Sequence, residues 1–537
     1  MYHPLFAFVA LALAPFASAQ TDSLLLNGNF ETLAPATQRP ADWPDAAFAS
    51  WPVEEGNRFL RLQSAEPGKL QSLHLEIPVP AGVRALALGF RARVSNLKKG
   101  EKPWHDARII IDFKDASGQR IGNAPPSYFG GNTKGWIDRV NRFLVPVEAR
   151  TLVVMPALFY PLAGTFDLDD ITLTPIDHVA LEEQLARNAP PPVPPREDPA
   201  PTKFPAPLRV SGNRIIDAAG REVWLQGVNV PSLEWTPKGD NVLSSVVVAI
   251  EQWKSNVIRL PLKEKYWFGK DPSQDDNGKS YRELVDQAIV LAANRGAYVI
   301  IDNHNYRAIR DEHIAFWKDV SSAYANHPAV LFDLINEPHG ITWDVWRDGG
   351  FVAERKAGAD EDNFITDEEK IAAKLGFKSP GMQKALDELR ATGARNVVVV
   401  GALDYSYDLS GILKGYALSD KTGNGIIYAS HIYPWKSDWQ GKVLDVAAHH
   451  PVLIGEIGAD SKPQPWENPA NYVTPESWLP DMLGLIQKHR LNWTGWSFHP
   501  KAGPAMLSDW RYTPSSYWGA WAKRALAGEQ FELKRLR

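Results

Sequence analysis

Apolar and polar residues follow two different patterns in the two halves of the chain. Between residues 21 and 176, short segments with a period of two are separated by turn-rich stretches. Such alternation is typical of β-strands that bury one face and expose the other. The clearest segments are residues 70–77, 84–94, 108–113, 151–158 and 165–173. This half is therefore predicted to be an all-β jelly-roll sandwich.

After residue 208 the apolar segments become continuous, and helical stretches lie between most of them. The predicted strands are residues 223–230, 256–262, 297–303, 329–335, 396–402, 426–432, 451–457 and 492–498. Alternating strands and helices indicate an α/β fold with a parallel sheet, and eight such units predict a closed (β/α)₈ TIM barrel. A hairpin at residues 209–217 would cap the barrel floor. Residues 340–381, rich in charge and glycine, would form a loop over the active-site face.

The ends of these regions suggest four parts. Residues 5–16 are apolar and lead into Ala17-Ser18-Ala19-Gln20, the small-x-small pattern of a secretory cleavage site. Residues 1–20 are thus predicted to be a signal peptide, and the protein to be secreted or periplasmic. Residues 21–176 are predicted to form the β-sandwich domain, and residues 208–537 the barrel domain. The proline-rich residues 177–207 between them are predicted to be a linker with extended polyproline character.

Composition excludes several other classes of protein. The hydrophobic share of 44% and the mean hydropathy of −0.29 leave no surplus for a multi-span membrane protein, so no membrane partner is expected. A net charge of −5 argues against nucleic acid. The absence of cysteine excludes disulfides and thiolate metal sites. We expect a monomer, and the 20 tryptophans hint at a carbohydrate ligand, because their flat faces suit sugar rings.

Polar residues recur at the carboxyl ends of the predicted barrel strands, where such barrels carry their active sites. They are Asn229, Arg259, His304-Asn305, Asn336-Glu337, His431, Tyr433, Glu456 and Trp496. A ring of buried polar groups is costly unless its members bond to one another. The pattern therefore predicts a functional site at this rim.

Two of these residues are glutamates that could act together as a catalytic pair. Glu337 and Glu456 follow the fourth and seventh strands, which lie across the barrel mouth from one another. Two carboxyls about 5 to 5.5 Å apart would give retaining hydrolysis. Glu337 would be the general acid/base, with its neutral form favoured by burial. Glu456 would be the nucleophile, kept ionised by Arg259 and hydrogen-bonded by Tyr433.

The strand ends also resemble a known family. They read Ile258-Arg-Leu-Pro261, Asp302-Asn-His304, Asn336-Glu-Pro338, His431-Ile-Tyr433 and Gly455-Glu-Ile-Gly458. Over about residues 208–525 this set resembles glycoside hydrolase family five, the cellulases and mannanases. The resemblance implies a polysaccharide substrate and no cofactor for catalysis. It also implies that Asn336 grips the sugar 2-hydroxyl, that His304 and His431 shape the same subsite, and that Trp496 stacks beneath the sugar.

The first domain carries a second resemblance. Residues 26–31 and 166–172 are similar to the first and last strands of jelly-roll carbohydrate-binding modules, which implies Glu31 and Asp170 as ligands of a structural calcium. The alternative is that these are acidic strand ends in solvent. Four aromatic residues in polar loops could stack on sugar or pack within the domain: Trp104, Tyr128, Phe129 and Trp136.

Several alternatives remain open at this point. A metal-dependent barrel would need a histidine pair on its first strand, and residues 223–229 contain none. A non-catalytic polysaccharide-binding barrel would lack one of the two glutamates. We expect a secreted endo-β-glycanase acting on β-1,4-glucan, with β-mannan or another β-glucan as alternative substrates. Whether the enzyme cleaves within chains or from their ends depends on whether residues 340–381 close one end of the cleft. The sequence does not show where these residues lie.

Overall fold

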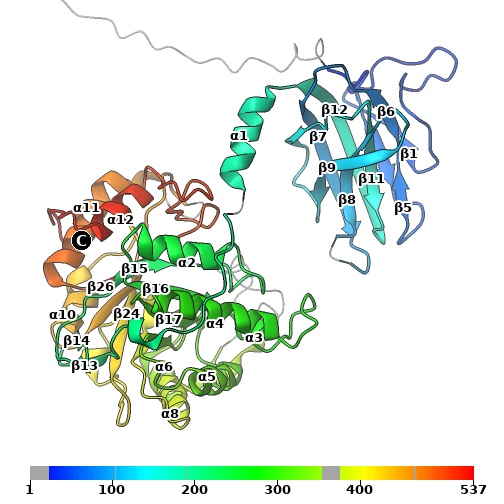
Figure 1. The fold of residues 1–537 in the computed structure, drawn as a ribbon. Coiled ribbons are helices and arrows are strands. Elements are labelled where there is room, and N and C mark those ends of the chain that lie inside the picture. The colour runs from blue at the N-terminus through cyan, green and yellow to red at the C-terminus, as the bar shows by residue number, and fades with distance from the viewer. Residues whose placement is uncertain (1–22, 103, 190, 354–374, 465–466, 468) are drawn as a thin grey trace, which may run out of the picture. The chain divides into compact units, whose positions relative to one another are not determined.

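The structure is a computed structural model that describes residues 23–537 except 103, 190, 354–374, 465–466 and 468 (Figure 1). The predicted signal peptide lies outside the described residues. The described chain divides into two compact units between Arg187 and Asn188. None of the helices in the described residues is both long enough and apolar enough to cross a membrane.

The first unit consists of two antiparallel sheets, with strand orders β1-β4-β12-β7-β10 and β5-β11-β8-β9, and β6 also pairs with β11. A small hairpin joins β2 to β3. The strands are β1 Ala49–Ser50, β2 Val53–Glu54, β3 Asn57–Arg58, β4 Leu60–Gln63, β5 Leu70–Ser72, β6 Leu75–Pro78, β7 Ala85–Lys98, β8 Asp106–Lys114, β9 Arg120–Phe129, β10 Ile137–Leu144, β11 Thr151–Phe159 and β12 Ala163–Pro175.

The core of this unit lies between the two sheets. Alternate residues of β7, such as Leu86, Leu88 and Phe90, share one apolar cluster with Ile109 of β8 and Leu152 of β11. The intervening residues face outward, as the period of two requires. The all-β prediction is confirmed for this unit, whereas its assignment as a carbohydrate-binding module stays a prediction.

The predicted linker is partly helical, and its later part contacts the barrel. Helix α1 spans His178–Asn188, and the carboxylate of Asp177 accepts hydrogen bonds from its first backbone amides. Further along, Glu197 pairs with Arg295 at 2.9 Å, and the backbone amide of Ala200 donates to Asn294. The described end of the proline-rich segment is therefore held on the barrel surface.

The second unit is a closed barrel of eight parallel strands. Each predicted barrel strand contains one observed strand, so the (β/α)₈ fold is confirmed. The strands are β15 Gln226–Asn229, β16 Val257–Leu262, β17 Tyr298–Asn303, β19 Val330–Asp333, β23 Val398–Gly401, β24 Ile426–Ile432, β25 Val452–Ile457 and β26 Asn492–Gly495. They are buried along their whole length, except for half-buried Gln226, because side chains fill the barrel interior and helices cover its outside.

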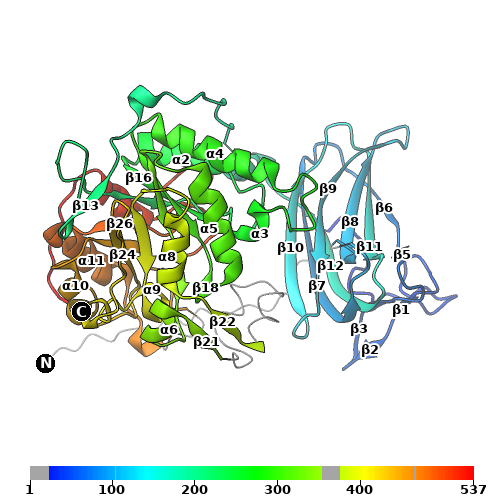
Figure 2. The ribbon, with the colours of Figure 1, turned by 90° about the horizontal axis from the view of Figure 1, so that it is seen from below.

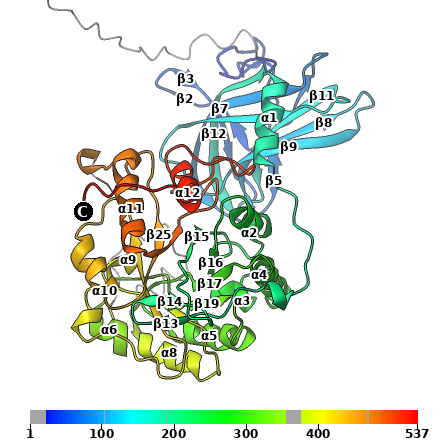
Figure 3. The same ribbon diagram turned by 60° about the vertical axis from the view of Figure 1, so that its left-hand side comes forward.

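Helices surround the strands of the barrel, as Figures 2 and 3 show for α2, α4, α5 and α8 and for α10 to α12. The longer ones are amphipathic, and α4 buries Val285, Ile289 and Ala292 against the strands. The helices are α2 Val242–Glu251, α3 Glu264–Trp267, α4 Lys279–Ala293, α5 Asp311–Ala323, α6 Trp343–Asp348, α8 Met382–Arg390, α9 Leu403–Ser406, α10 Asp445–Ala447, α11 Pro475–His489 and α12 Gly519–Leu526.

Two shorter features lie at opposite ends of the barrel. The predicted floor hairpin is present as β13 (Arg209–Ser211) and β14 (Arg214–Ile216), and Ile215 packs in the cluster that contains the starts of the strands. The predicted insertion at residues 340–381 contains α6 and the pair β21 (Gly350–Val352) and β22 (Phe377–Ser379). Residues 354–374 of that insertion lie outside the described chain.

Candidate active site

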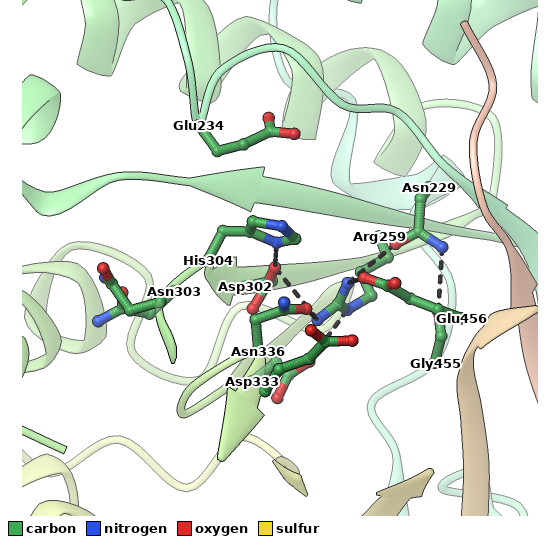
Figure 4. Close-up of polar contacts among 12 residues, drawn as sticks. Asn229, Glu234, Arg259, Asp302, Asn303, His304, Asp333, Asn336, Gly455 and Glu456 are labelled. Atoms are coloured by element: carbon green, nitrogen blue, oxygen red, sulfur yellow. Dashed lines mark hydrogen bonds and ion pairs between the residues drawn. The ribbon is translucent and has the colours of Figure 1, made fainter. Parts of the chain in front are cut away.

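The predicted rim residues lie at or just beyond the carboxyl ends of the strands, and Figure 4 shows five of them: Asn229, Arg259, His304, Asn336 and Glu456. Glu337 lies in β20 (Glu337–Pro338), just beyond β19, and Glu456 lies in β25. A short parallel ladder between β20 and β18 (Tyr306–Arg307) fixes Glu337, whose backbone amide donates to the carbonyl of Asn305 at 3.1 Å. Both glutamates are therefore placed by regular backbone pairing rather than by a free loop.

The two glutamates are close enough to act on one bond. One carboxylate oxygen of Glu337, one of Glu456 and a ring nitrogen of His431 lie within 4.8 Å of one another. Retaining glycosidases hold their two carboxyls about 5 to 5.5 Å apart, whereas inverting enzymes leave room for a water between them. This spacing is compatible with a nucleophile and an acid/base acting on the same anomeric carbon.

Arg259 is the centre of the polar network. Its side chain is fully buried, and its nitrogens lie 3.1 Å from Asp302, 3.0 Å from Asp333 and 3.1 Å from Glu456. It also donates to the side-chain oxygens of Asn229 (3.0 Å) and Asn336 (2.8 Å). One guanidinium thus holds five groups from four other barrel strands or their ends in a fixed arrangement. The planar fork of an arginine can do this, whereas the ammonium of a lysine cannot.

The two glutamates have different electrostatic surroundings. Burial and the nearby charge of Glu456 raise the pKa of Glu337 well above its usual range. Burial also raises the pKa of Glu456, but the charge of Arg259 and a 2.7 Å hydrogen bond from the hydroxyl of Tyr433 oppose that rise. The arrangement therefore favours a protonated Glu337 beside an ionised Glu456.

His431 lies between the glutamates as a neutral imidazole. Burial lowers the pKa of His431 well below its usual value, and its Nδ1 lies 3.0 Å from Glu337 and 3.7 Å from Glu456. Gly455 makes room for the ring, because a Cβ there would lie 2.9 Å from Nε2 of His431. A neutral ring can hydrogen-bond Glu337 in either protonation state.

His304 and Trp496 form the other side of the site. Nδ1 of His304 lies 2.6 Å from Asp302, which orients the ring, and the ring stacks on Trp496 with centroids 5.4 Å apart and planes 10° apart. All six predicted substrate-binding residues thus line the rim around the two glutamates: Arg259, His304, Asn336, His431, Tyr433 and Trp496.

Sequence reasoning gave no role to three acidic residues in or near this network, although it quoted Asp302 within a strand-end motif. Asp302 and Asp333 both contact Arg259, and Glu234 lies in the segment after β15 (Figure 4). Burial raises the pKa of Glu234 to about 8. Their positions in the sequence could have identified them, because Asp302 and Asp333 lie at the ends of buried strands and Glu234 follows such a strand within five residues. A buried acidic residue is rare unless it is paired, so its position in a buried segment indicates a partner.

Each predicted calcium ligand contacts another protein group. Glu31 accepts a hydrogen bond from the backbone amide of Arg58 at 2.6 Å, and Asp170 lies 3.5 Å from the guanidinium of Arg91. Within the described part of the chain, one group of three potential metal ligands is clustered, and it consists of Glu337, His431 and Glu456. The cationic Arg259 beside that group disfavours a bound metal ion.

The hydrogen bond from Tyr433 leads to a prediction on pH dependence. A carboxylate nucleophile is lost as pH falls through its pKa, and a carboxylic acid is lost as pH rises through its own. Tyr433→Phe removes a bond that lowers the pKa of Glu456, so that pKa rises. The acidic limb of a pH profile of kcat/KM should move up by about one pH unit, and the alkaline limb should stay.

Tyr428→Phe is the matched control, because that buried hydroxyl accepts from the amide of Leu418 and contacts neither glutamate. A shift of the alkaline limb alone in Tyr433→Phe, or equal shifts in the two variants, would contradict this assignment of the two limbs.

Comparison with known proteins points to one family. A family model described as cellulase (glycosyl hydrolase family 5) matches residues 216–502. The chain is 21% identical to endoglucanase E-5 of Thermobifida fusca over 54% of this chain and 55% of that protein. It is 25% identical to an endoglucanase of Paenibacillus polymyxa over 56% of this chain and 82% of that protein. The chain spans about half the length of the first relative and 34% of a matching endoglucanase A of Butyrivibrio fibrisolvens.

Solved structures with a similar barrel are also found. The β-glucanase SdGluc5_26A of Saccharophagus degradans is 23% identical, with a TM-score of 0.47 over 62% of this chain and 97% of that one. The catalytic domain of Thermobifida fusca endoglucanase Cel5A is 18% identical, with a TM-score of 0.41 over 60% of this chain and 97% of that one.

Proposed function

The chain belongs to the cellulase family, glycosyl hydrolase family 5, and from this premise we propose that it is a retaining endo-β-glycanase that cleaves β-1,4-glucan. As a member of the family it is a glycoside hydrolase. The retaining mechanism is supported by the pair of glutamates, which have carboxylate oxygens within 4.8 Å of each other. Glu456 lies beside Arg259, whereas half-buried Glu337 has no cation in direct contact among the described residues.

The proposed reaction proceeds in two displacements. Glu456 attacks the anomeric carbon while Glu337 gives its proton to the departing glycosidic oxygen, so that a glycosyl-enzyme ester forms and one sugar chain leaves. Glu337, now ionised, takes a proton from water, whose oxygen attacks the same carbon and releases Glu456. Each step inverts the carbon once, and the product keeps the β configuration.

The remaining rim residues are proposed to hold the sugar at the cleaved bond. Asn336 would accept or donate a hydrogen bond at the 2-hydroxyl, with its amide oxygen oriented by Arg259 at 2.8 Å. His304 and His431 would shape the same subsite, and Trp496 would stack beneath the ring. The names of the curated relatives favour glucan as substrate. β-Mannan is the second candidate, because the catalytic pair suits both sugars.

The rest of the chain is proposed to serve the same reaction. We propose that residues 1–20 direct export, that residues 21–176 bind polysaccharide, that 177–207 connect the domains, and that the enzyme is a secreted or periplasmic monomer. Catalysis in this family needs no cofactor. A structural calcium at Glu31 and Asp170 stays a prediction.

A panel of polysaccharides with EDTA present tests this function. We expect reducing ends from β-1,4-glucan, fewer from mannan, xyloglucan or β-1,3-glucan, and a fall in viscosity that precedes most sugar release, as internal cleavage requires. Proton NMR of the first product should detect the β-anomer. An α-anomer would contradict retention, loss of activity in EDTA would contradict the carboxylate mechanism, and binding without products would indicate a non-catalytic protein.

A further inference from the structure

Two aromatic side chains of the first unit are strongly exposed. Trp104 is 55% exposed and Tyr128 is 68% exposed. The other two aromatics predicted as candidates for sugar stacking are otherwise engaged: Phe129 packs in the sandwich core, and Arg91 and Arg93 lie over the ring of Trp136 at 5.3 and 4.7 Å. The structure therefore separates two available rings from two that serve packing.

Arg108 of β8 joins the two exposed residues on one face of the sheet. Tyr128 of β9 is its register partner, so both side chains leave the same face. The guanidinium of Arg108 also donates to the backbone carbonyl of Trp104 at 2.5 Å. It lies 4.3 Å from the ring centroid of Phe159 and is held by Asp106 through two bonds of 2.6 and 2.8 Å. Trp104 through its backbone carbonyl and Tyr128 through its register position thus both adjoin the residue that carries this fixed guanidinium.

The loop that carries Trp104 is packed against the sandwich. The ring of His105 lies 5.3 Å from that of Tyr160 and 6.5 Å from that of Phe159. Gly100 permits this approach, because a Cβ there would lie 2.3 Å from the carbonyl oxygen of Tyr160 and 2.5 Å from Nδ1 of His105. Trp104 is therefore exposed although the residue next to it packs against the sandwich.

The geometry points to a polysaccharide-binding surface formed by Trp104 and Tyr128 around Arg108, whose ligand is a neutral β-linked glucan chain. This inference rests on the proposed function, since it gives the ligand as the polymer that the barrel cleaves. Exposed apolar surface rimmed by polar groups is one mark of a ligand-binding site. The axial C–H faces of a β-linked pyranose can cover such rings while its equatorial hydroxyls stay hydrated.

The charges at the surface favour a neutral chain. Asp106 is 2% exposed and compensates the charge of Arg108, so the central cation is not available to attract an anion. The remaining N–H groups of a guanidinium can still donate to sugar hydroxyls. Lys99 and Lys102 in the neighbouring loop could instead attract an acidic polymer, and the salt dependence of binding separates the two cases.

Adsorption of the full chain to insoluble cellulose tests the inference. Every protein carries Glu456→Ala, so that the polymer is not degraded during the measurement. Replacing Trp104 and Tyr128 together by Ala should weaken adsorption by at least about tenfold. Val140→Ala, at a 57% exposed apolar position on β10 of the other sheet, should leave it within about twofold. Adsorption of the parent protein should persist in about 0.5 M NaCl, where charge attraction is screened.

The paired variant Trp104→Phe and Tyr128→Phe keeps both rings and should retain adsorption, which separates stacking from misfolding. Equal adsorption by the parent and the double Ala protein, or adsorption that high salt abolishes, would overturn the inference. In the otherwise wild-type chain, the double Ala variant should hydrolyse a soluble aryl cellobioside at the normal rate. No glucan hydrolysis by the wild-type chain would refute the proposed function instead, and adsorption through the two rings would still stand.

Discussion

Replacing Glu456, the proposed nucleophile, should have the largest effect of any single substitution. We expect Glu456→Ala to lower kcat on β-1,4-glucan by about 10⁵-fold or more, because no other group can form the glycosyl-enzyme. The fold should survive, since Arg259 keeps its contacts with Asp302 at 3.1 Å and Asp333 at 3.0 Å and is not left as an unpaired buried charge. Steady-state kinetics, thermal unfolding and oligosaccharide binding measure these three properties.

A surface carboxylate provides the matched control. Glu251 on α2 is half-exposed and pairs with Arg295, away from the rim, so Glu251→Ala should retain normal turnover. Near-normal activity of Glu456→Ala would refute the mechanism. A large fall in melting temperature together with lost oligosaccharide binding would show that Glu456 is needed for the structure of the site. The loss of activity could then not be assigned to the chemical step alone.

The barrel could be predicted from the sequence because its strands are buried on both faces. A strand such as Val257–Leu262 is buried at every position and reads as one apolar segment. Its polar exception, Arg259, then stands out. The same logic found Glu456 within the buried strand Val452–Ile457. Because burying a charge is costly, a charged residue in a fully buried strand indicates a functional role and can be recognised in the sequence.

The edge strands of the sandwich were not visible in this way. Strand β9 (Arg120–Phe129) contains Pro125 and Pro126 and is mostly exposed. Proline cannot donate to a ladder, and so it occurs at sheet edges and bulges, where β9 lies. Strand β10 (Ile137–Leu144), at the edge of the other sheet, is also largely exposed. Edge strands lack the clean alternation on which the prediction relied.

The sharing of Arg259 among several carboxylates could not be predicted either. Asp302 and Asp333 end neighbouring strands, but only the closed barrel directs both side chains at one guanidinium. Burial raises the pKa of each to about 7, so the charge available to Glu456 depends on its neighbours as well as on Arg259. Spacing along the sequence gives strand order, whereas the electrostatic balance of the rim is a property of three-dimensional convergence.

Glu337→Ala should separate the acid/base from the nucleophile. A sugar leaving group needs a proton on its oxygen, so we expect kcat/KM on oligosaccharides to fall by about 10³-fold, within the range for general acid catalysis. An aryl glycoside whose phenolate leaves without a proton should still form the glycosyl-enzyme at a near-normal rate. Breakdown of that intermediate should become slow, because Glu337 also deprotonates the attacking water. A burst of phenolate followed by slow turnover would reveal this.

Azide then distinguishes a retaining acid/base from a merely important carboxylate. Azide needs no general base, and removal of the Glu337 carboxylate takes away a charge that would repel an anion. Glu456 is neutral in the glycosyl-enzyme ester, and His431, 3.0 Å from Glu337, is a neutral ring. Added azide should therefore speed turnover of Glu337→Ala on the aryl glycoside and yield a β-glycosyl azide, and it should leave the wild-type rate unchanged. Proton NMR reads the configuration of the product. If azide gives no rescue, or if the azide product is the α-anomer, Glu337 is not the acid/base of a retaining pair.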